Sequence, residues 1–390
     1  MMIISPKRGF EVSEYENRLD NIQKLMHESR MDAILLTTQA DIEYYTGFKT
    51  QFFQSPTRPW YVLIPINEKP KAIIPTIGES GMRRTWLDDI QTWISPNPKD
   101  EGISLLLSTI KSLTKKHKCL GVPKSQESVL RMPLDDYENL VKSLDGIEIK
   151  DANKILRQVR LIKSTAEIEK IKHICQLTSQ GFKDLNHLLK AGESEHENCK
   201  RFKQHLLSLG VDDTPYMVAG SGKDGYGSII MGPGDKIIEE GDLFIVDTGS
   251  VFDSYFCDFD RNYAFGFICD EAKKAYQVVF DATDAGFNAA QLGNTTSDIY
   301  HAMNNVMQKG GALGNSVGRL GHGLGLQLTE WPSNTATDNT TLEPGVILTL
   351  EPGMEYLPGK EMVHEENIVI TENGPEWLTQ RASAELPIIQ

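Results

Sequence analysis

Apolar positions in the first third of the chain alternate between helical and strand spacing. In residues 14–30 they recur with helical period, at Tyr15, Leu19, Ile22, Leu25 and Met26. The apolar run at 32–38 (DAILLTT) is typical of a buried strand. Residues 61–66 and 71–76 predict two more strands, joined by the turn-like sequence NEKP. The alternation continues to about residue 150 and predicts a compact α/β domain.

The pattern changes between residues 150 and 165. Ser164 and Glu167 have the spacing of a capping box, and a long amphipathic helix is expected after them. Long helices then give way to strands separated by glycine-rich turns, and strands dominate the end of the chain. A length of 390 residues suits two hydrophobic cores. We therefore predict an α+β protein with domains at residues 1–158 and 159–390.

Composition and charge narrow the class of protein. The chain is 39% hydrophobic and 24% charged, which favours a soluble globular protein. No apolar run reaches the roughly 20 residues of a membrane span, and the first residues lack a signal peptide's apolar stretch. We therefore expect a cytoplasmic protein without a membrane partner. The net charge of -14 also disfavours nucleic acid as a partner. Five cysteines without a C-x-x-C pair argue against a disulfide framework or a zinc–thiolate site.

The first motif with chemical potential spans residues 242–266. It predicts a β-hairpin in which LFIVD is one strand, TGSVFDS the turn and YFCDFDRNYAF the second strand. Asp247 and Asp258, eleven positions apart, then lie on adjacent strands. Two carboxylates in an apolar sheet repel each other unless a cation lies between them. The alternative interpretation is an ordinary hairpin with solvated acids.

Three more candidate ligands follow downstream. His322 is flanked by glycines, which allow close approach of the backbone, although a lone histidine can equally be structural. Glu351 ends the apolar run VILTL, and Glu365 begins EENIVIT. Acids at the ends of buried strands are costly unless they are paired or bind a metal. Four carboxylates and one imidazole suit two divalent ions such as Mn, Fe, Co or Zn, which can activate a water molecule.

These motifs together resemble the pita-bread family of creatinase, prolidase, aminopeptidase P and methionine aminopeptidase. VDTG and CDFDR resemble its two aspartate motifs, GHGLG its histidine motif, and LEPGM and HEENIVIT its two glutamate motifs. Near the start, DAILLTTQADIEYYTGF resembles the N-terminal domain of creatinase and prolidase. The resemblance covers nearly the whole chain. It implies a creatinase-like α/β domain followed by a pita-bread catalytic domain, and a homodimer.

The resemblance also implies a role for each ligand. Asp247 chelates one metal ion, Asp258 and Glu365 bridge the two ions, and His322 and Glu351 bind the other. Glu351 is also the family's candidate general base. These roles predict a dinuclear, manganese-type metallopeptidase that cleaves a C–N bond in a dipeptide or a small amide, for example as an Xaa-Pro dipeptidase or aminopeptidase.

The chain departs from the peptidase pattern at three positions. The peptidases place a histidine seven residues after the ligand histidine, where this chain has Thr329. A second histidine is expected before the first aspartate, but AGSGKDGYGSIIMGPGD contains none. The arginine expected two residues before the last glutamate is Val363. An amide nitrogen needs a proton donor to leave, and Thr329 can offer a hydrogen bond but is a weak acid. His364 is next to Glu365, but strand alternation should point it to the opposite face.

Two other functions stay open. The segment TEWPS resembles the dimethylsulfoniopropionate lyases of this fold. Those enzymes, however, have one aspartate at or next to the position of Thr329 and another where this chain has Gly249. A metal-dependent C–S lyase acting on a small zwitterion is therefore one alternative. A catalytically silent binding protein is the other, and the five intact ligand positions argue against it.

Three aromatic residues are candidates for substrate binding. Trp331 could face a cationic group, since an indole face attracts onium ions. Trp60 belongs to an aromatic segment of the N-terminal domain, and Tyr226 is, with Tyr216, a possible proton donor. The alternative for the tryptophans is an ordinary place in the core or at a dimer contact. The expected partner is a small molecule or a dipeptide.

Overall fold

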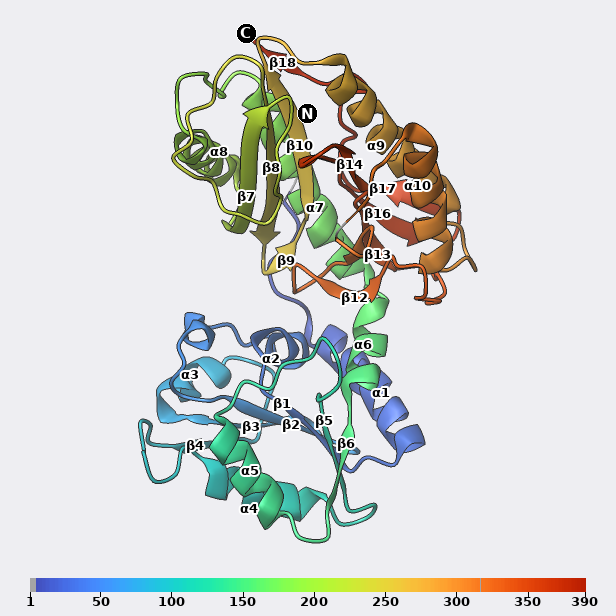
Figure 1. Ribbon diagram of the computed structural model, residues 1–390. Helices are drawn as coiled ribbons and strands as arrows, with labels where there is room; N and C mark the ends of the chain where they lie inside the picture. The colour runs from blue at the N-terminus through green and yellow to red at the C-terminus, as the bar shows by residue number, and fades with distance from the viewer. Residues whose placement is uncertain (1–4, 316) are drawn as a thin grey trace. The chain divides into compact units, whose positions relative to one another are not determined.

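Residues 5–315 and 317–390 are described by the computed structural model, which divides the chain into two compact units (Figure 1). Lys7–Arg160 forms the N-terminal unit, and Leu161–Gln390 forms the bulk of the C-terminal unit. The division predicted after residue 158 lies close to this boundary. Within the described ranges, none of the helices combines the length and the apolar character that a bilayer span requires.

The N-terminal unit is a six-stranded mixed sheet with the strand order β4-β3-β2-β1-β5-β6. Its strands are β1 (Ala33–Leu36), β2 (Tyr61–Pro65), β3 (Lys71–Pro75), β4 (Ile90–Trp93), β5 (Cys119–Val122) and β6 (Glu148–Asp151). Its helices are α1 (Val12–Ser29), α2 (Gln39–Thr46), α3 (Glu79–Met82), α4 (Ile103–Leu113), α5 (Leu134–Ser143) and α6 (Asn153–Leu161), with short 3₁₀ turns at Gln51–Gln54 and Thr76–Gly78.

The apolar pattern predicted these first elements correctly. The helix expected at 14–30 is α1, and the three expected strands are β1, β2 and β3, with β2 and β3 antiparallel across the NEKP turn. Every residue of β1 and β2 is buried, because helices or loops cover both faces of the sheet. Side chains of α4 and α5 pack against one face through Leu106, Ile110 and Leu140.

The C-terminal unit contains four long helices and twelve strands within the described residues. The helices are α7 (Thr165–Leu185), α8 (Glu195–Leu209), α9 (Asp270–Ala289) and α10 (Thr296–Gly310). The first sheet has β7 (Asp213–Lys223), β8 (Asp242–Phe252), β9 (Tyr255–Phe256), β10 (Phe259–Phe265) and β18 (Ile388–Ile389). The second has β11 (His322–Gly323), β12 (Glu330–Ser333), β13 (Ile347–Leu350), β16 (Glu366–Thr371) and β17 (Gly374–Trp377), and β14 (Gly353–Leu357) pairs with β15 (Lys360–Val363).

These elements occur in the same order twice. A helix pair (α7 and α8) precedes the first sheet, and a second pair (α9 and α10) precedes the other, as the green and orange segments of Figure 1 show. The capping box predicted at Ser164 and Glu167 is confirmed at the start of α7. Helices α8 and α10 also begin with capping boxes. The sheets meet where β10 contacts β16, so residues at the ends of these strands face a common interior.

The turn predicted for the hairpin of the first sheet, residues 248–254, contains the real turn but begins too early. Strand β8 does not end at Asp247 but continues to Phe252, and the reversal occurs at Asp253 and Ser254. Both turn residues have positive φ angles, 50° and 72°, as a two-residue type I′ turn requires. Asp253 accepts this conformation because its short polar side chain tolerates the left-handed region, and it forms a buried ion pair with Lys170. Asp247 therefore lies in the middle of a buried strand.

Candidate metal centre

The five predicted ligands come together from both sheets. Asp247 lies in β8, Asp258 just before β10, His322 in β11, Glu351 just after β13 and Glu365 just before β16. Their potential ligand atoms form two groups, Asp258–His322–Glu351 and Asp247–Asp258–Glu365, and within each group these atoms lie within 4.8 Å of one another. The two groups share Asp258. This arrangement offers two adjacent cation positions with one carboxylate common to both.

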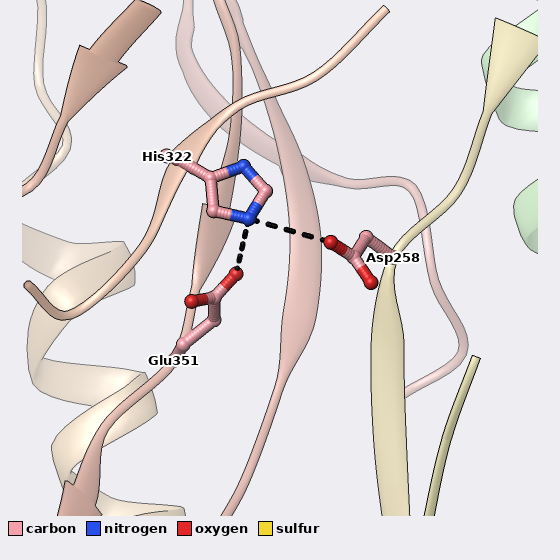
Figure 2. A group of neighbouring side chains, drawn as sticks. All are labelled: Asp258, His322 and Glu351. Atoms are coloured by element: carbon pink, nitrogen blue, oxygen red, sulfur yellow. Dashed lines mark ion pairs between the residues drawn. The ribbon is translucent and has the colours of Figure 1, made fainter. Parts of the chain in front are cut away.

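The His322 ring is oriented for ligation (Figure 2). Its Nδ1 lies 2.8 Å from the carbonyl oxygen of Gly323, which can only accept, so Nδ1 carries the hydrogen. Its Nε2 faces Glu351 Oε1 at 2.9 Å and Asp258 Oδ2 at 3.3 Å. Thr349 links the same two elements, since its Oγ1 accepts the His322 backbone N–H at 2.8 Å and donates to Glu351 Oε1 at 2.6 Å.

The glycines around His322 have a steric role. A side chain on Gly321, which has a φ of 129°, would place its Cβ 2.2 Å from the carbonyl oxygen of Thr349. A Cβ on Gly323 would lie 2.5 Å from the carbonyl oxygen of Trp331. Strand β11 is therefore pressed between β12 and β13, and only glycine fits on either side of the ligand histidine. The glycines predicted a close approach to the backbone here, and the groups that approach are the backbones of the neighbouring strands.

Electrostatics divide the site into two parts. Burial by itself lowers the pKa of His322, but the Glu351 and Asp258 carboxylates overcome it and raise that pKa to about 10. Burial by itself would raise the pKa of Glu351, but the His322 ring outweighs burial and lowers this pKa to about 2. In the other part, burial and neighbouring carboxylates hold the pKa of Asp247 and of Glu365 well above the usual range. Excess negative charge is thus concentrated around Asp247 and Glu365.

Unpartnered oxygens test whether the site fits divalent cations. Within the described residues, Asp247 Oδ1, Asp258 Oδ1 and Glu365 Oε2 are buried and have no hydrogen-bond partner. Leaving such atoms unpaired costs about 1–3 kcal/mol each, and more when they are charged. Hard oxygen donors plus one imidazole match the preferences of borderline divalent ions. The site therefore fits two divalent cations held by these five side chains.

A sixth carboxylate, Asp260, belongs to the same surface and was not singled out from the sequence. Asp260 pairs directly with Asp247 across β8 and β10, so both side chains lie on the same face of the sheet. It is fully buried, and its Oδ1 accepts the backbone N–H of Glu365 at 3.1 Å. Its Oδ2 has no partner within the described residues. The motif CDFDR contains the signal, since residues two apart on a strand share a face.

Tyr216 also faces the site and is placed better for chemistry than Tyr226. It pairs with Gly249 on the face of β8 that carries Asp247, and the charge of that carboxylate acts on its phenol. Burial and then the carboxylates of Asp247 and Glu365 raise the pKa of Tyr216, so the phenol stays protonated. By contrast, the buried Tyr226 hydroxyl donates to Asn262 Oδ1 and accepts the Val363 N–H. These two bonds give the Tyr226 hydroxyl partners within the fold.

The other predicted site residues lie in different surroundings. Trp60 is 1% exposed and packs against Phe48 and Phe53 in the N-terminal unit. Trp331 is half-buried against the core of the C-terminal unit. Thr329 is exposed, and its Oγ1 accepts a hydrogen bond of 3.5 Å from Arg319. The interpretation of the tryptophans as core residues fits Trp60 well.

The side chains that alternate with the site residues form a separate cluster, in which Glu366 is neutralised by two arginines. Glu366, adjacent to Glu365, accepts from Arg261 and Arg381, each at 3.1 Å. His364 Nε2 lies 2.8 Å from Arg381, and burial lowers the pKa of His364 to about 4. His364 therefore points away from the predicted ligands, as strand alternation indicated.

Comparison with known proteins identifies the family. Residues 169–372 match metallopeptidase family M24, and residues 18–162 match the creatinase/prolidase N-terminal domain. The chain belongs to metallopeptidase family M24. As a member of family M24, it is a metal-dependent hydrolase with the predicted fold, a creatinase-type N-terminal domain followed by a pita-bread catalytic domain. It diverges from the peptidase pattern at the two histidine positions.

Relatives of this M24 protein span nearly its whole length. An uncharacterized peptidase from Staphylococcus epidermidis is 26% identical over 376 residues, covering 93% of this chain and 99% of the relative. A prolidase structure from Thermococcus sibiricus has a TM-score of 0.87 at 22% identity, covering 97% of this chain and 100% of the other. The N-terminal domain of FACT complex subunit SPT16 from Cicer arietinum has a TM-score of 0.78 at 16% identity, covering 97% and 99%. The structural matches establish the shared fold.

Proposed function

We propose that this M24 protein is a two-cation hydrolase that cleaves the C–N bond of a dipeptide, with Xaa-Pro dipeptides as the first candidates. The observation that carries the proposal is the pair of ligand groups sharing Asp258, in which three carboxylates each keep an unpartnered oxygen. Similarity to a prolidase and to an uncharacterized peptidase supports the choice of a peptide substrate. The predicted homodimer and cytoplasmic location belong to the same proposal.

Each ligand has a defined place in this chemistry. Asp247, Asp258 and Glu365 would hold one cation, and Asp258, His322 and Glu351 the other. When bound, two such ions activate water and polarise the substrate carbonyl. Thr349 fixes the Glu351 carboxylate through its 2.6 Å hydrogen bond, so that Glu351 is oriented to take the proton of the attacking water.

The leaving nitrogen needs a proton, and the usual histidine is absent from position 329. We propose that Tyr216 supplies a hydrogen bond at this edge of the site, because it lies on the face of the sheet that carries Asp247 and its raised pKa keeps the phenol protonated. Thr329 can offer only a hydrogen bond, because its neutral hydroxyl is a weak acid. Proton delivery to the amine would then come from Glu351 after it has taken the water proton.

The C–S lyase is the second candidate, and one structural observation disfavours it. Gly249 stands where the related lyases have an aspartate, and a Cβ at this position would lie 2.2 Å from Leu328 Cδ1. An apolar side chain therefore occupies the space in which the lyase carboxylate would lie. The absence of the peptidase histidines still makes dimethylsulfoniopropionate a necessary test substrate.

A single panel separates the three functions. The purified chain is loaded with Mn(II) and incubated with Xaa-Pro and other dipeptides and, separately, with dimethylsulfoniopropionate, with Glu351→Gln as control. The proposal predicts amino acids released from at least one dipeptide and loss of this activity in the variant. Dimethyl sulfide without dipeptide cleavage would establish the lyase instead. Metal uptake without any turnover, or no uptake at all, would support a binding protein.

A further inference from the structure

We propose that Arg319 is the anion-binding residue of this site and that it selects substrates carrying a free carboxylate close to the bond that is cleaved. The inference rests on the proposed function and extends it to substrate class. It assigns to Arg319 and Thr329 the recognition of a dipeptide's C-terminal carboxylate.

The position of Arg319 places a cation beside the ligands. Arg319 lies three residues before His322, on the segment that leads into β11, and it is half-buried. Its Nη2 lies 3.5 Å from the hydroxyl oxygen of Thr329. The segment before Thr329 is anchored over the first sheet, since Phe256 N–H donates to the Gly325 carbonyl oxygen and Leu328 fills the space above Gly249. Arg319 and Thr329 therefore meet at the edge of the ligand cluster.

The guanidinium of Arg319 lacks a carboxylate partner within the part of the chain described. Its one hydrogen bond there goes to Thr329, a neutral and weak acceptor. The other arginines near this sheet are different, because Arg261 and Arg381 are both neutralised by Glu366, and Arg381 also pairs with Asp284 at 2.6 Å. A half-buried guanidinium has five N–H donors in a planar fork that suits a carboxylate. Arg319 therefore has unused donors available to an external anion.

Charge balance in the loaded site favours the same occupant. The positive charge of Arg319 reaches Asp258 and Glu351, where it opposes the upward effect of burial on the pKa of each carboxyl. Once cations neutralise these carboxylates, Arg319 is left without a counter-charge. A dipeptide carries its carboxylate within one residue of the scissile bond, so an anchor next to the ligands can reach it. An arginine cannot act as a general acid at neutral pH, so its contribution is binding and orientation.

The test compares a free acid with its amide. The probe is a non-hydrolysable alanyl-proline analogue with a methyleneamine in place of the peptide bond, prepared as the C-terminal acid and as the amide. Binding of each to the Mn(II)-loaded full-length protein is measured by calorimetry. A charged hydrogen-bonded pair predicts that the acid binds about 10- to 100-fold more tightly than the amide in the wild type. Arg319→Met should reduce this ratio to about one, and Arg319→Lys should retain part of it.

Two further variants control for folding and charge. Lys309→Met removes one positive charge from an exposed position on α10 and should leave the acid-to-amide ratio unchanged. Thr329→Val removes the hydroxyl that holds Arg319 and should reduce the ratio only a few-fold. An unchanged ratio in Arg319→Met, or no preference for the acid in the wild type, would overturn the inference. An Arg319-dependent preference without dipeptide hydrolysis would instead contradict the proposed function alone.

Discussion

Glu365 and Glu366 are adjacent and both buried, but their electrostatic surroundings are opposite. Glu366 lies between Arg261 and Arg381, and these cations, with His364, outweigh burial and hold its pKa well below the usual range. Glu365 faces Asp247, Glu351 and Asp260, and burial together with these carboxylates raises its pKa. Strand alternation thus separates a charge-balanced cluster on one face from an unbalanced one on the other.

This difference distinguishes a buried carboxylate that stabilises the fold from one that binds a cation. A buried carboxylate surrounded by arginines stabilises the fold when all its partners are present, and it needs nothing from outside. A group of buried carboxylates with unpartnered oxygens destabilises the metal-free fold and requires cations to become neutral. Substitutions on the two faces should therefore affect different properties, and the following experiments are ordered by expected effect.

Asp258→Asn should have the largest effect, on activity. Asp258 is common to both ligand groups, so its loss should impair both cation positions and lower kcat/KM for a cleaved dipeptide at least about 1,000-fold. The metal-free stability should stay equal or rise, since a like charge is removed. Steady-state kinetics and urea unfolding in the presence of a chelator measure the two effects. If the metal-free variant were strongly destabilised, Asp258 would be a residue that stabilises the fold and not primarily a cation ligand.

Glu366→Gln should show the opposite behaviour. It breaks a buried pair with two arginines, which typically costs about 3–5 kcal/mol of unfolding free energy. The cost should be the same with chelator and with Mn(II), because Glu366 does not face the ligand cluster. Urea unfolding under both conditions tests this, and a loss that disappears on adding metal would show that the two faces are not separate.

Thr349→Val sharpens the comparison inside the site. It removes the hydroxyl that joins the His322 backbone to the Glu351 carboxylate, while the volume stays nearly constant. Supporting contacts of this kind typically change metal affinity about 10- to 100-fold. Competition titration with a fluorescent chelator measures the affinity, and Thr283→Val, on the buried face of α9, is the matched control. Equal affinities for Thr349→Val and the wild type would contradict the supporting role.

Asp260→Asn should have the smallest effect, and in the stabilising direction. It keeps the Oδ1 that accepts the Glu365 N–H but removes one negative charge from the unbalanced face. The metal-free protein should gain about 1 kcal/mol of unfolding free energy, and the Mn(II)-loaded protein should gain less. Thermal unfolding with and without metal makes the comparison. A destabilised metal-free variant would show that the Asp260 charge is compensated within the fold.

The fold and the ligand residues could be predicted from the sequence, whereas most residues around the site could not. Apolar periodicity is a local property, so α1, β1, β2 and β3 could be located. Four acids and one histidine in the order of a known family marked the ligand positions. The hairpin turn was predicted too long, over residues 248–254, because Thr248, Gly249 and Ser250 are small or polar residues typical of a turn. The real turn is confined to Asp253 and Ser254. The roles of Tyr216 and Asp260 depend on strand register, and that of Arg319 on where a loop crosses a sheet. Strand register and the path of a loop are not encoded in a local pattern, although the two-residue spacing in CDFDR does indicate that Asp258 and Asp260 share a face.

Counting bound metal tests the central claim most directly. The chain is stripped with a chelator, titrated with Mn(II) and examined by native mass spectrometry beside Asp258→Asn. Two ions per wild-type chain, with at least one lost in the variant, is the predicted result. Fewer than two ions in the wild type, or the same number in both proteins, would contradict the assignment of these five side chains as a two-cation site.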